Sequence, residues 1–354
     1  MRSSLIRHIF TSLFPPPRFL EMPAVGLDIS DEVVRFVELK RVRGHFELGM
    51  FGEKKIPPDV VEFGYIKDMP ALTKLLLELR KEHNLKFVKV SLPEEKAYLF
   101  RTNIQRMEES EIRGALQFKI EENVPIALAS AVYDYKMIKG TDQPDGQMDI
   151  GVTVIHRKVV DSYLSVIQNA GMTPIELRTE AQAIAHTFVS PNDQSAYIII
   201  GVRETKTVLA IISNSVVQFT STLPIGGKAI VESIAHQFED IEKKAPGTGD
   251  KASTEMFQSL VNAASVLRDE VQKLFTYWEG HPIVNEGRKI ERIVLSGSNA
   301  MAGLDGYLSS SFSIPVEIAN AWKKVASVNE YIPPINLKES LDYIPAIGLA
   351  LPYD

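Results

Sequence analysis

A pattern of three short strands occurs twice in the chain, and this repeat strongly limits the folds that the chain can adopt. Residues 24–57, AVGLDISDEVVRFVELKRVRGHFELGMFGEKKIP, place an apolar strand before a charged turn and two further strands. Residues 196–227, AYIIIGVRETKTVLAIISNSVVQFTSTLPIGG, repeat this order with nearly the same spacing. A Rossmann unit would alternate strand and helix instead. The repeat therefore predicts a duplicated domain, whose two halves face each other across a cleft with one charged hairpin turn on each side.

A different pattern separates the two repeats. Residues 94–171 read as strand, helix, strand, strand and helix, with Pro125 ending the first helix and Gly171 the second. The expected elements are strands at 98–104, 132–139 and 148–155, helices at 108–123 and 158–171, and a hairpin loop at 141–147. We predict that this segment is a small α+β module inserted into the larger fold.

The remaining predicted elements complete the two halves. Leu72, Leu75, Leu76 and Leu79 share one face of a helix over 71–83, which indicates that this face lies in the core. The other expected elements are a strand at 86–92, helices at 227–244 and 259–278, a loop at 246–250, a strand at 292–296 and a helix at 344–352.

The composition excludes several classes of protein. A chain of 354 residues can form two domains, and 45% hydrophobic with 24% charged residues is ordinary for a globular protein. A formal net charge of −6 argues against binding to nucleic acid. The absence of cysteine excludes disulfides and thiolate chemistry. No apolar run reaches the roughly 18 residues that span a bilayer.

The sequence carries no recognisable catalytic or metal-binding motif. Its seven histidines never fall at i and i+4, so no zinc-binding pair is visible. Residues 226–229, GGKA, lack the first glycine and the final hydroxyl residue of a P-loop. Residues 296–300, SGSNA, lack the last glycine of a nucleophile elbow. We therefore predict no catalytic residue and no metal ligand.

The first 22 residues form a basic and apolar tail. This segment has three arginines and no acid before Glu21, and Arg7 and His8 interrupt its apolar run, so it does not fit a signal peptide. Two interpretations remain open. The segment is a short helix or frayed tail packed on the body, or it is a basic amphipathic helix that rests on a membrane surface.

Several segments, taken in order, resemble one family. They are VGLDISDEVVRFVEL (25–39), FRTNIQRMEESEIRGALQFKIEENVPIALASAVYDYKMI (100–138), AGMTPIELRTEAQAIAH (170–186), PIGGKAIVESIA (224–235), LRDEVQKLFTYWEGH (267–281), IVLSGSNAMAGLDGYL (293–308), IANAWKKV (318–325) and AIGLAL (346–351). The ordered set resembles the PilM family of type IV pilus assembly proteins, within the actin-like ATPase superfamily. The cell-division protein FtsA is the next most similar family.

The resemblance implies an α/β, actin-like (ribonuclease H-like) fold of two lobes, with the inserted α+β module as subdomain 1C. The implied division is a tail at 1–22, subdomain 1A at 23–93, subdomain 1C at 94–171, a connector at 172–194, subdomain 2A at 195–230 and 288–330, subdomain 2B at 231–287, and a C-terminal segment at 331–354 that returns to 1A.

The resemblance also implies a nucleotide site in the cleft. The positions that match the family's motifs are Gly26, Asp28, Gly201, Thr205, Gly226, Gly227 and Gly297. A purely structural interpretation stands beside this one. The glycines can end buried strands or cap a helix, and the aspartate can accept hydrogen bonds from the facing loop.

The sequence departs from the family where the chemistry should lie. The first turn carries Asp31 and Glu32 in place of small hydroxylated residues, and carboxylates repel phosphate. Ile199 stands where the second motif has an aspartate that orients Mg²⁺-bound water, and Ser298 and Asn299 replace glycines of the adenosine motif. ATP with Mg²⁺ is the implied cofactor, and these departures predict weak nucleotide binding or none, without hydrolysis. Arg203 is a candidate contact for any phosphate that does bind.

Three functions follow from the resemblance. The first is a cytoplasmic scaffold peripheral to the inner membrane, which binds the cytoplasmic tail of a PilN-like inner-membrane protein between subdomains 1A and 1C, near residues 88–104. The second is an active ATPase or small-molecule kinase, which would need an acid at position 199. The third is an FtsA-like filament adaptor, but no amphipathic extension follows the final LPYD. Self-association remains open, and any membrane contact is expected to be indirect or through the tail.

Overall fold

The computed structural model describes residues 24–42, 44–138, 146–190, 193–229, 249–297, 299–300, 303–327 and 329–352. Several predicted features lie outside the described residues. They are the tail at 1–22, most of the helix predicted at 227–244, most of the loops at 141–147 and 246–250, and Ser298.

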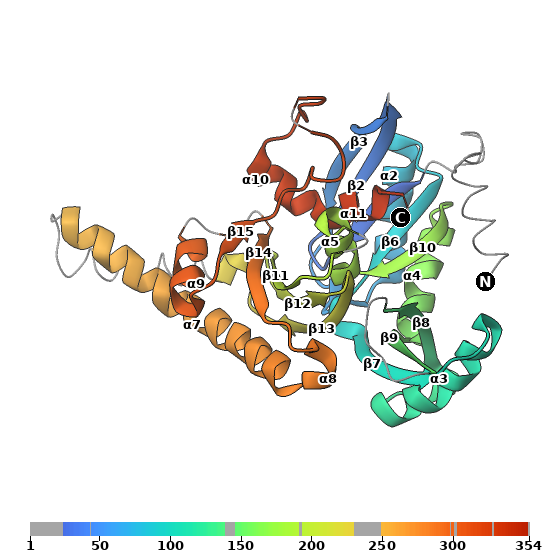
Figure 1. Cartoon of the computed structure of the whole chain (residues 1–354). Coiled ribbons are helices and arrows are strands. Elements are labelled where there is room, and N and C mark those ends of the chain that lie inside the picture. Colours follow the sequence, from blue (N-terminus) through green and yellow to red (C-terminus); the bar gives the residue numbers. More distant parts are fainter. Residues whose placement is uncertain are drawn as a thin grey trace.

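The two predicted repeats lie in two separate five-stranded sheets (Figure 1). The first sheet has the order β3-β2-β1-β6-β10, and the second has the order β13-β12-β11-β14-β15. In each sheet the three consecutive strands pair antiparallel, and the last two strands run parallel to the first strand of the repeat. The shared order confirms the duplicated, two-lobed α/β fold.

Eight of the ten strands in these sheets lie where the sequence analysis predicted a strand. The first sheet contains β1 (Val25–Ile29), β2 (Val33–Val42), β3 (His45–Lys55), β6 (Phe87–Leu92) and β10 (Thr173–Thr179). The second contains β11 (Ala196–Val202), β12 (Thr207–Ser213), β13 (Val216–Leu223), β14 (Ile290–Ser296) and β15 (Val316–Ile318). The sequence analysis missed the two edge strands β10 and β15, and the short hairpin of β4 (Val61–Glu62) and β5 (Tyr65–Ile66).

Two short helices pack between the sheets, α5 (Glu180–Phe188) and α11 (Ile344–Ala350). They share one apolar cluster with residues of both repeats, including Val37 of β2 and Ile199 of β11. Two glycines permit this close packing. A Cβ atom at Gly26 would lie 1.9 Å from the carbonyl oxygen of Ala346, and a Cβ atom at Gly348 would lie 1.9 Å from that of Ala183. The lobes therefore share a core instead of meeting only at their surfaces.

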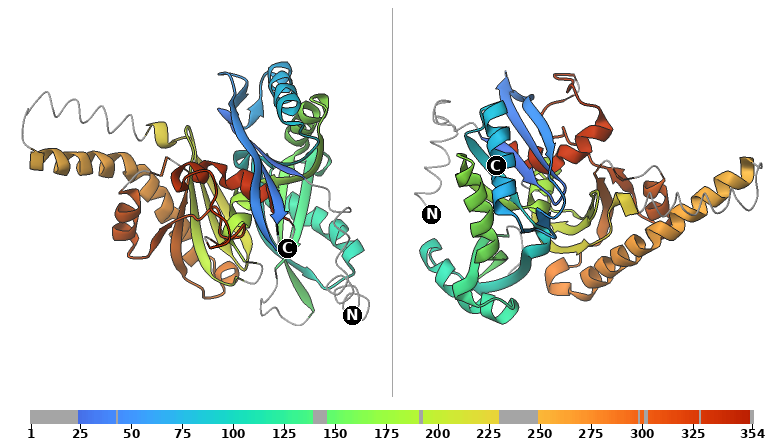
Figure 2. Two further views of the ribbon diagram at one scale, coloured as in Figure 1. Left: turned by 90° about the horizontal axis from the view of Figure 1, so that it is seen from above. Right: turned by 180° about the vertical axis from the view of Figure 1, so that it is seen from behind.

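Four further helices cover the outer faces of the sheets (Figures 1 and 2). In the first lobe these are α2 (Met69–His83), which buries the four predicted leucines, and α4 (Arg157–Asn169). In the second lobe they are α7 (Gly249–Gly280) and α9 (Leu304–Phe312). Figure 2 shows that α7 extends well beyond the sheet that it covers.

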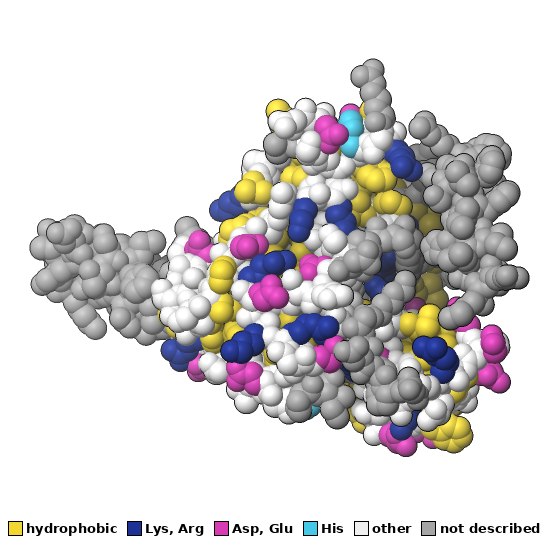
Figure 3. Space-filling model, in the orientation of Figure 1, with side chains coloured by type: hydrophobic (Ala, Val, Ile, Leu, Met, Phe, Trp, Pro, Cys, Tyr) yellow, Lys and Arg dark blue, Asp and Glu magenta, His cyan; other side chains and the backbone are white. Residues whose placement is uncertain are grey.

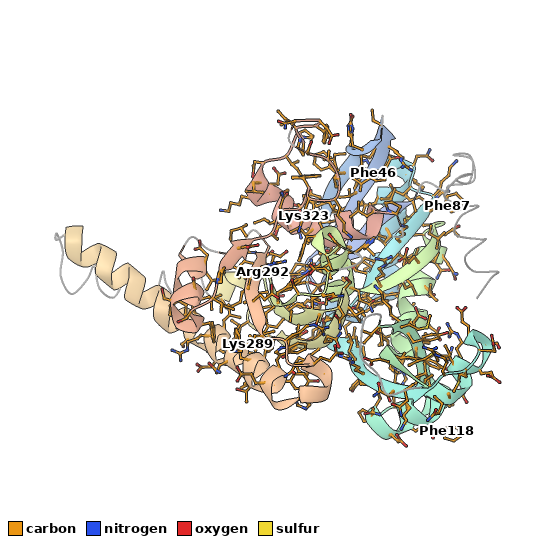
Figure 4. The ribbon with its side chains drawn as sticks, viewed as in Figure 1. Phe46, Phe87, Phe118, Lys289, Arg292 and Lys323 are labelled. Carbon is orange, nitrogen blue, oxygen red and sulfur yellow. The ribbon has the colours of Figure 1, made fainter. Side chains whose placement is uncertain are left out.

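The predicted insertion forms a separate sheet of order β7-β9-β8. Its strands are β7 (Ala97–Gln105), β8 (Ala131–Met137) and β9 (Gln147–His156), and α3 (Glu109–Asn123) covers one face. Phe118 is 72% exposed and points outward from this helix (Figure 4). Helix α4 is the last element of the predicted module, but it packs with α2 in the core of the first lobe. It therefore connects the insertion to the first lobe.

Short elements complete the chain. They are the 3₁₀ turns η2 (Glu94–Lys96), η3 (Leu128–Ser130) and η4 (Leu341–Tyr343), and the helices α8 (Pro282–Asn285) and α10 (Leu337–Ser340).

Candidate functional site

A cleft of about 530 Å³ separates the two charged hairpin turns. This volume is in the range of small-molecule sites. The cleft is lined by Ser30, Glu32, Val33 and Arg35 from the first repeat, by Gly201, Arg203 and Glu204 from the second, and by Glu180, Ile184, Lys228, Ser296, Gly297, Asn299, Leu341, Asp342 and Pro345. Both acidic and basic side chains line the cleft.

Arg203 crosses the cleft from the β11–β12 turn to the first lobe. Its Nη1 lies 2.9 Å from Asp28 Oδ2, its Nη2 donates to Asp28 Oδ1 at 3.1 Å, and its Nε donates to Glu180. Ser91 also donates to Asp28, at 2.7 Å. Burial alone would raise the pKa of Asp28, but the charge and hydrogen bonds of Arg203 outweigh it and hold this pKa below its usual value. The guanidinium expected to contact phosphate is thus held by two carboxylates of the protein itself.

Lys206, at the end of the same β11–β12 turn, also extends across the cleft from the second lobe. Its Nζ lies 2.9 and 2.8 Å from the two carboxylate oxygens of Glu95, and 3.6 Å from Glu180. Burial opposes the charge on Lys206, yet Glu180 and Glu95 raise its pKa above the usual value. We call Arg203 and Lys206, together with Asp28, Glu95 and Glu180, the interlobe clamp.

The two acids of the first turn point to different neighbours. Asp31 accepts hydrogen bonds from the backbone amides of Phe63 at 2.9 Å and Gly64 at 3.0 Å, in the β4–β5 hairpin. Glu32 faces the cleft and accepts from the hydroxyl of Thr205. Burial, and then the charge of Asp31, raise the pKa of Glu32. The expectation that both carboxylates face a phosphate position is therefore wrong for Asp31.

The predicted glycines mostly pack against other backbone segments. A Cβ atom at Gly226 would lie 2.3 Å from the carbonyl oxygen of Glu204, and one at Gly227 would lie 2.1 Å from Asn299 Cβ. Gly297 has a φ of +92°, and its Cβ would lie 2.1 Å from the carbonyl oxygen of Val202. Only Gly201 and Gly297, among the seven predicted site residues, line the cleft. The other five lie beside it or beneath it.

Helix α5 begins at the clamp and supplies residues that the sequence analysis missed. Thr179 caps it in a capping box with Gln182, which places Glu180 at the helix N-terminus. Buried Glu94 also accepts from the amide of Ala181, at 2.8 Å. Burial raises the pKa of Glu94 to about 7, against the opposing effect of that hydrogen bond. The available signal was the T-E-A-Q capping box at 179–182, which predicts a helix that begins at Glu180 and places an acid at its N-terminus.

A second cavity of about 560 Å³, which we call the tail groove, lies between the insertion, the first lobe and the second lobe. Its walls come from β8 and β9, from the end of β10 and α5, and from the β12–β13 turn at 214–217. Of the predicted region at 88–104, only Leu92 lines it. Lys136 of β8 donates to the carbonyl oxygen of Ser215 at 3.3 Å, so the insertion contacts the second lobe here.

A buried arginine joins the insertion to the second lobe at another place. Arg101 of β7 donates to Asp149 of β9, with one contact at 2.8 Å, and to Glu286 after α8. It also donates to the carbonyl oxygen of Val284 at 2.6 Å. The Asp149 side chain is fully buried, so the arginine is its charge partner in the protein interior.

The described residues contain no group of three or more histidine, aspartate and glutamate side chains that could hold a metal ion. Within the same residues, no helix is long and apolar enough to cross a membrane. The face shown in Figure 3 mixes basic and acidic side chains over its described part and displays no single-sign patch there.

Two sheets of the same order, facing each other across α5 and α11 with a cleft between their hairpin turns, define an actin-like ATPase fold. The solved PilM–PilN type IV pilus biogenesis complex matches with a TM-score of 0.74 and 19% identity, over 94% of this chain and 98% of that one. MreB5 of Spiroplasma citri bound to ADP matches with a TM-score of 0.49 and 15% identity, over 93% and 95%. The ethanolamine utilization protein EutJ from Carboxydothermus hydrogenoformans matches with a TM-score of 0.46 and 15% identity, over 95% and 90%.

The family described as type IV pilus assembly protein PilM matches residues 26–353. The chain therefore belongs to the PilM family, as its ordered motifs predicted. This membership supports a role in type IV pilus assembly.

Proposed function

We propose that this protein is a cytoplasmic scaffold of the type IV pilus machine, and that the tail groove binds the cytoplasmic tail of a PilN-like inner-membrane protein. The observation that carries the proposal is a groove flanked by two sheet edges, β8 of the insertion and β10 of the first lobe. An extended peptide gains affinity by pairing with a strand edge and gains specificity from pockets for alternate side chains. The likeness in fold to a PilM–PilN complex supports the same partner class.

The lining of the groove suits such a peptide. Leu177, Ala185 and Val189 supply apolar surface, while Thr153 and Gln182 supply hydrogen-bonding groups. Gln182 donates to the hydroxyl of Thr153 at 3.1 Å, which links α5 to β9 across the groove. A chain of alternating apolar and polar residues matches this mixture better than a purely apolar ligand does.

A labelled peptide with the sequence of the cytoplasmic segment of a PilN-like protein from the same organism tests the proposal. We expect the wild-type protein to bind it, and Thr153→Arg to weaken binding at least tenfold, because the added side chain fills the groove. Thr102→Arg is the matched control, because Thr102 lies on β7 and does not line the groove. Fluorescence anisotropy measures all three affinities. Equal binding by both variants, or no binding by wild type, would refute the proposal.

We also propose that the cleft does not hydrolyse ATP. Arg203 already pairs with Asp28 and Glu180, so a phosphate must compete with two buried carboxylates for it. Ile199 lies fully buried in the core between the sheets and offers no oxygen to a metal ion. The residues present do not fit a site for Mg²⁺ and a triphosphate.

The corresponding prediction is that calorimetry with MgATP detects no micromolar binding and that phosphate release stays at the background rate. Lys228 and Arg35 also line the cleft, so weak binding near millimolar concentration is compatible with this expectation. An active ATPase assayed in parallel verifies the phosphate assay. Steady turnover by the wild-type protein, lost on unfolding, would contradict the prediction.

A further inference from the structure

The interlobe clamp joins the two lobes by direct contacts between charged side chains. Arg203 and Lys206 belong to the second lobe. Asp28 belongs to the first lobe, Glu180 to α5, and Glu95 to the turn η2 at the start of the insertion. All five side chains are at least nine-tenths buried, so solvent and salt screen their attraction little. Each cation contacts Glu180, which makes the first residue of α5 the centre of the network.

Two elements, α5 and β12, connect the interlobe clamp to the tail groove. Glu180 of α5 pairs with the clamp cations, while Thr179, Gln182 and His186 of the same segment line the groove. Strand β12 begins directly after Lys206 and ends at the 214–217 turn, which forms the opposite wall. Seven residues of strand span roughly 20 Å, so β12 connects the clamp to the groove as one rigid element.

The groove therefore needs both lobes. If the second lobe moves away, the 214–217 turn moves with β12, and the contact from Lys136 to Ser215 is lost. The walls from β8, β9, β10 and α5 would remain, but one side of the groove would open.

We propose that the interlobe clamp closes the lobes without nucleotide and thereby keeps the tail groove in its binding shape. This inference rests on the proposed function for the identity of the groove's occupant. The closure itself is argued from the clamp geometry, which adds charge contacts to the apolar core that the lobes share. Arg203 and Lys206, the buried cations of the β11–β12 turn, hold the two lobes together as a ligand bound between them would. The groove is therefore already formed in the free protein.

Distance measurements between spin labels test the closure, and the absence of native cysteine makes the labelling specific. Labels at Lys81→Cys in α2 and Glu291→Cys in β14 report on the two lobes, and both positions are exposed. We expect one narrow distance distribution for wild type, unchanged by MgATP. Arg203→Gln is expected to broaden it toward longer distances and to weaken binding of the tail peptide at least tenfold.

Two further variants keep this test decisive. A variant with all five clamp residues neutralised (Asp28→Asn, Glu95→Gln, Glu180→Gln, Arg203→Gln and Lys206→Gln) removes the charges together. It leaves no buried ion of the clamp without a partner, and it is expected to fold while the lobes stay open. Arg268→Gln makes the same chemical change at an exposed ion pair with Asp269, and we expect wild-type distances and affinity.

The outcomes separate the two proposals. Wild-type distances and peptide affinity in the variant with all five clamp residues neutralised would overturn the clamp, and so would a wild-type distribution that narrows only when MgATP is added. Open lobes with unchanged peptide affinity would overturn the link between clamp and groove. Failure of the wild-type protein to bind the peptide would refute the proposed function, while the distances alone would still decide whether the clamp closes the lobes.

Discussion

Replacing Gly26 by alanine is expected to lower the thermal midpoint of this protein by about 5–10 °C. The new Cβ atom would lie 1.9 Å from the carbonyl oxygen of Ala346 and 2.8 Å from the amide nitrogen of Ala350. Both atoms belong to the backbone of α11, so neither can turn away as a side chain would. Overpacking costs about 1–3 kcal/mol and sometimes more, and each kcal/mol corresponds to about 2–4 °C in a domain of moderate size.

Gly201→Ala is the matched control for this change. Both glycines lie in the first strand of a repeat, and both match the family's phosphate motifs. At Gly201 the nearest atom to a new Cβ is Ile184 Cδ1 at 3.3 Å, the end of a flexible side chain, so we expect a shift of less than about 2 °C. Circular dichroism melting curves measure both variants. Equal midpoints for the two would show that α11 does not need its close approach to β1.

Arg101→Met is expected to reduce the free energy of unfolding by about 3–5 kcal/mol. The substitution leaves Asp149 buried without its charge partner, and breaking a buried pair from one side carries a cost of this order. It also removes the bonds to Val284 and Glu286 that join the insertion to the second lobe. We therefore expect faster proteolysis of the insertion together with the loss of stability in guanidinium titrations.

Two comparisons isolate the buried charge as the cause. Arg113→Met breaks an exposed ion pair with Asp134, at 3.4 Å in the same insertion, and is expected to cost less than about 1 kcal/mol. Arg101→Met combined with Asp149→Leu removes both buried charges and should recover a large part of the lost stability. An Arg101→Met protein as stable as Arg113→Met would show that the buried Asp149 carboxylate does not depend on Arg101.

The strands and helices of this protein follow from local patterns. Apolar runs bounded by charged turns predicted β1, β2, β11 and β12, and the leucine spacing predicted the buried face of α2. The strands β10 and β15, each at one edge of its sheet, escaped prediction, because β10 is partly exposed with weak alternation and β15 has only three residues. Residues of β10 and β15 are extended because they pair with β6 and β14, and the local sequence does not show which strands will be adjacent in the folded protein.

The candidate site, like the strands, was only partly predictable from the sequence. The order of its motifs indicated the family, and the resemblance predicted that Ile199 replaces an acid of the family's second motif. The sequence did not predict the direction in which each charged side chain points. Asp31 and Glu32 are neighbours, yet one binds the β4–β5 hairpin and the other faces the cleft.

The duplicated architecture and the insertion could thus be read from the sequence, whereas the departure from the family's phosphate motifs stays a prediction. These features depend on the order of segments and on local residue patterns, and both are present in the sequence itself. The pairing of Arg203 with Asp28, 175 residues away, and with Glu180 became visible only in the folded protein. A buried charge takes whichever partner the packing of α5 and the two sheets brings within contact, and that packing depends on the whole chain.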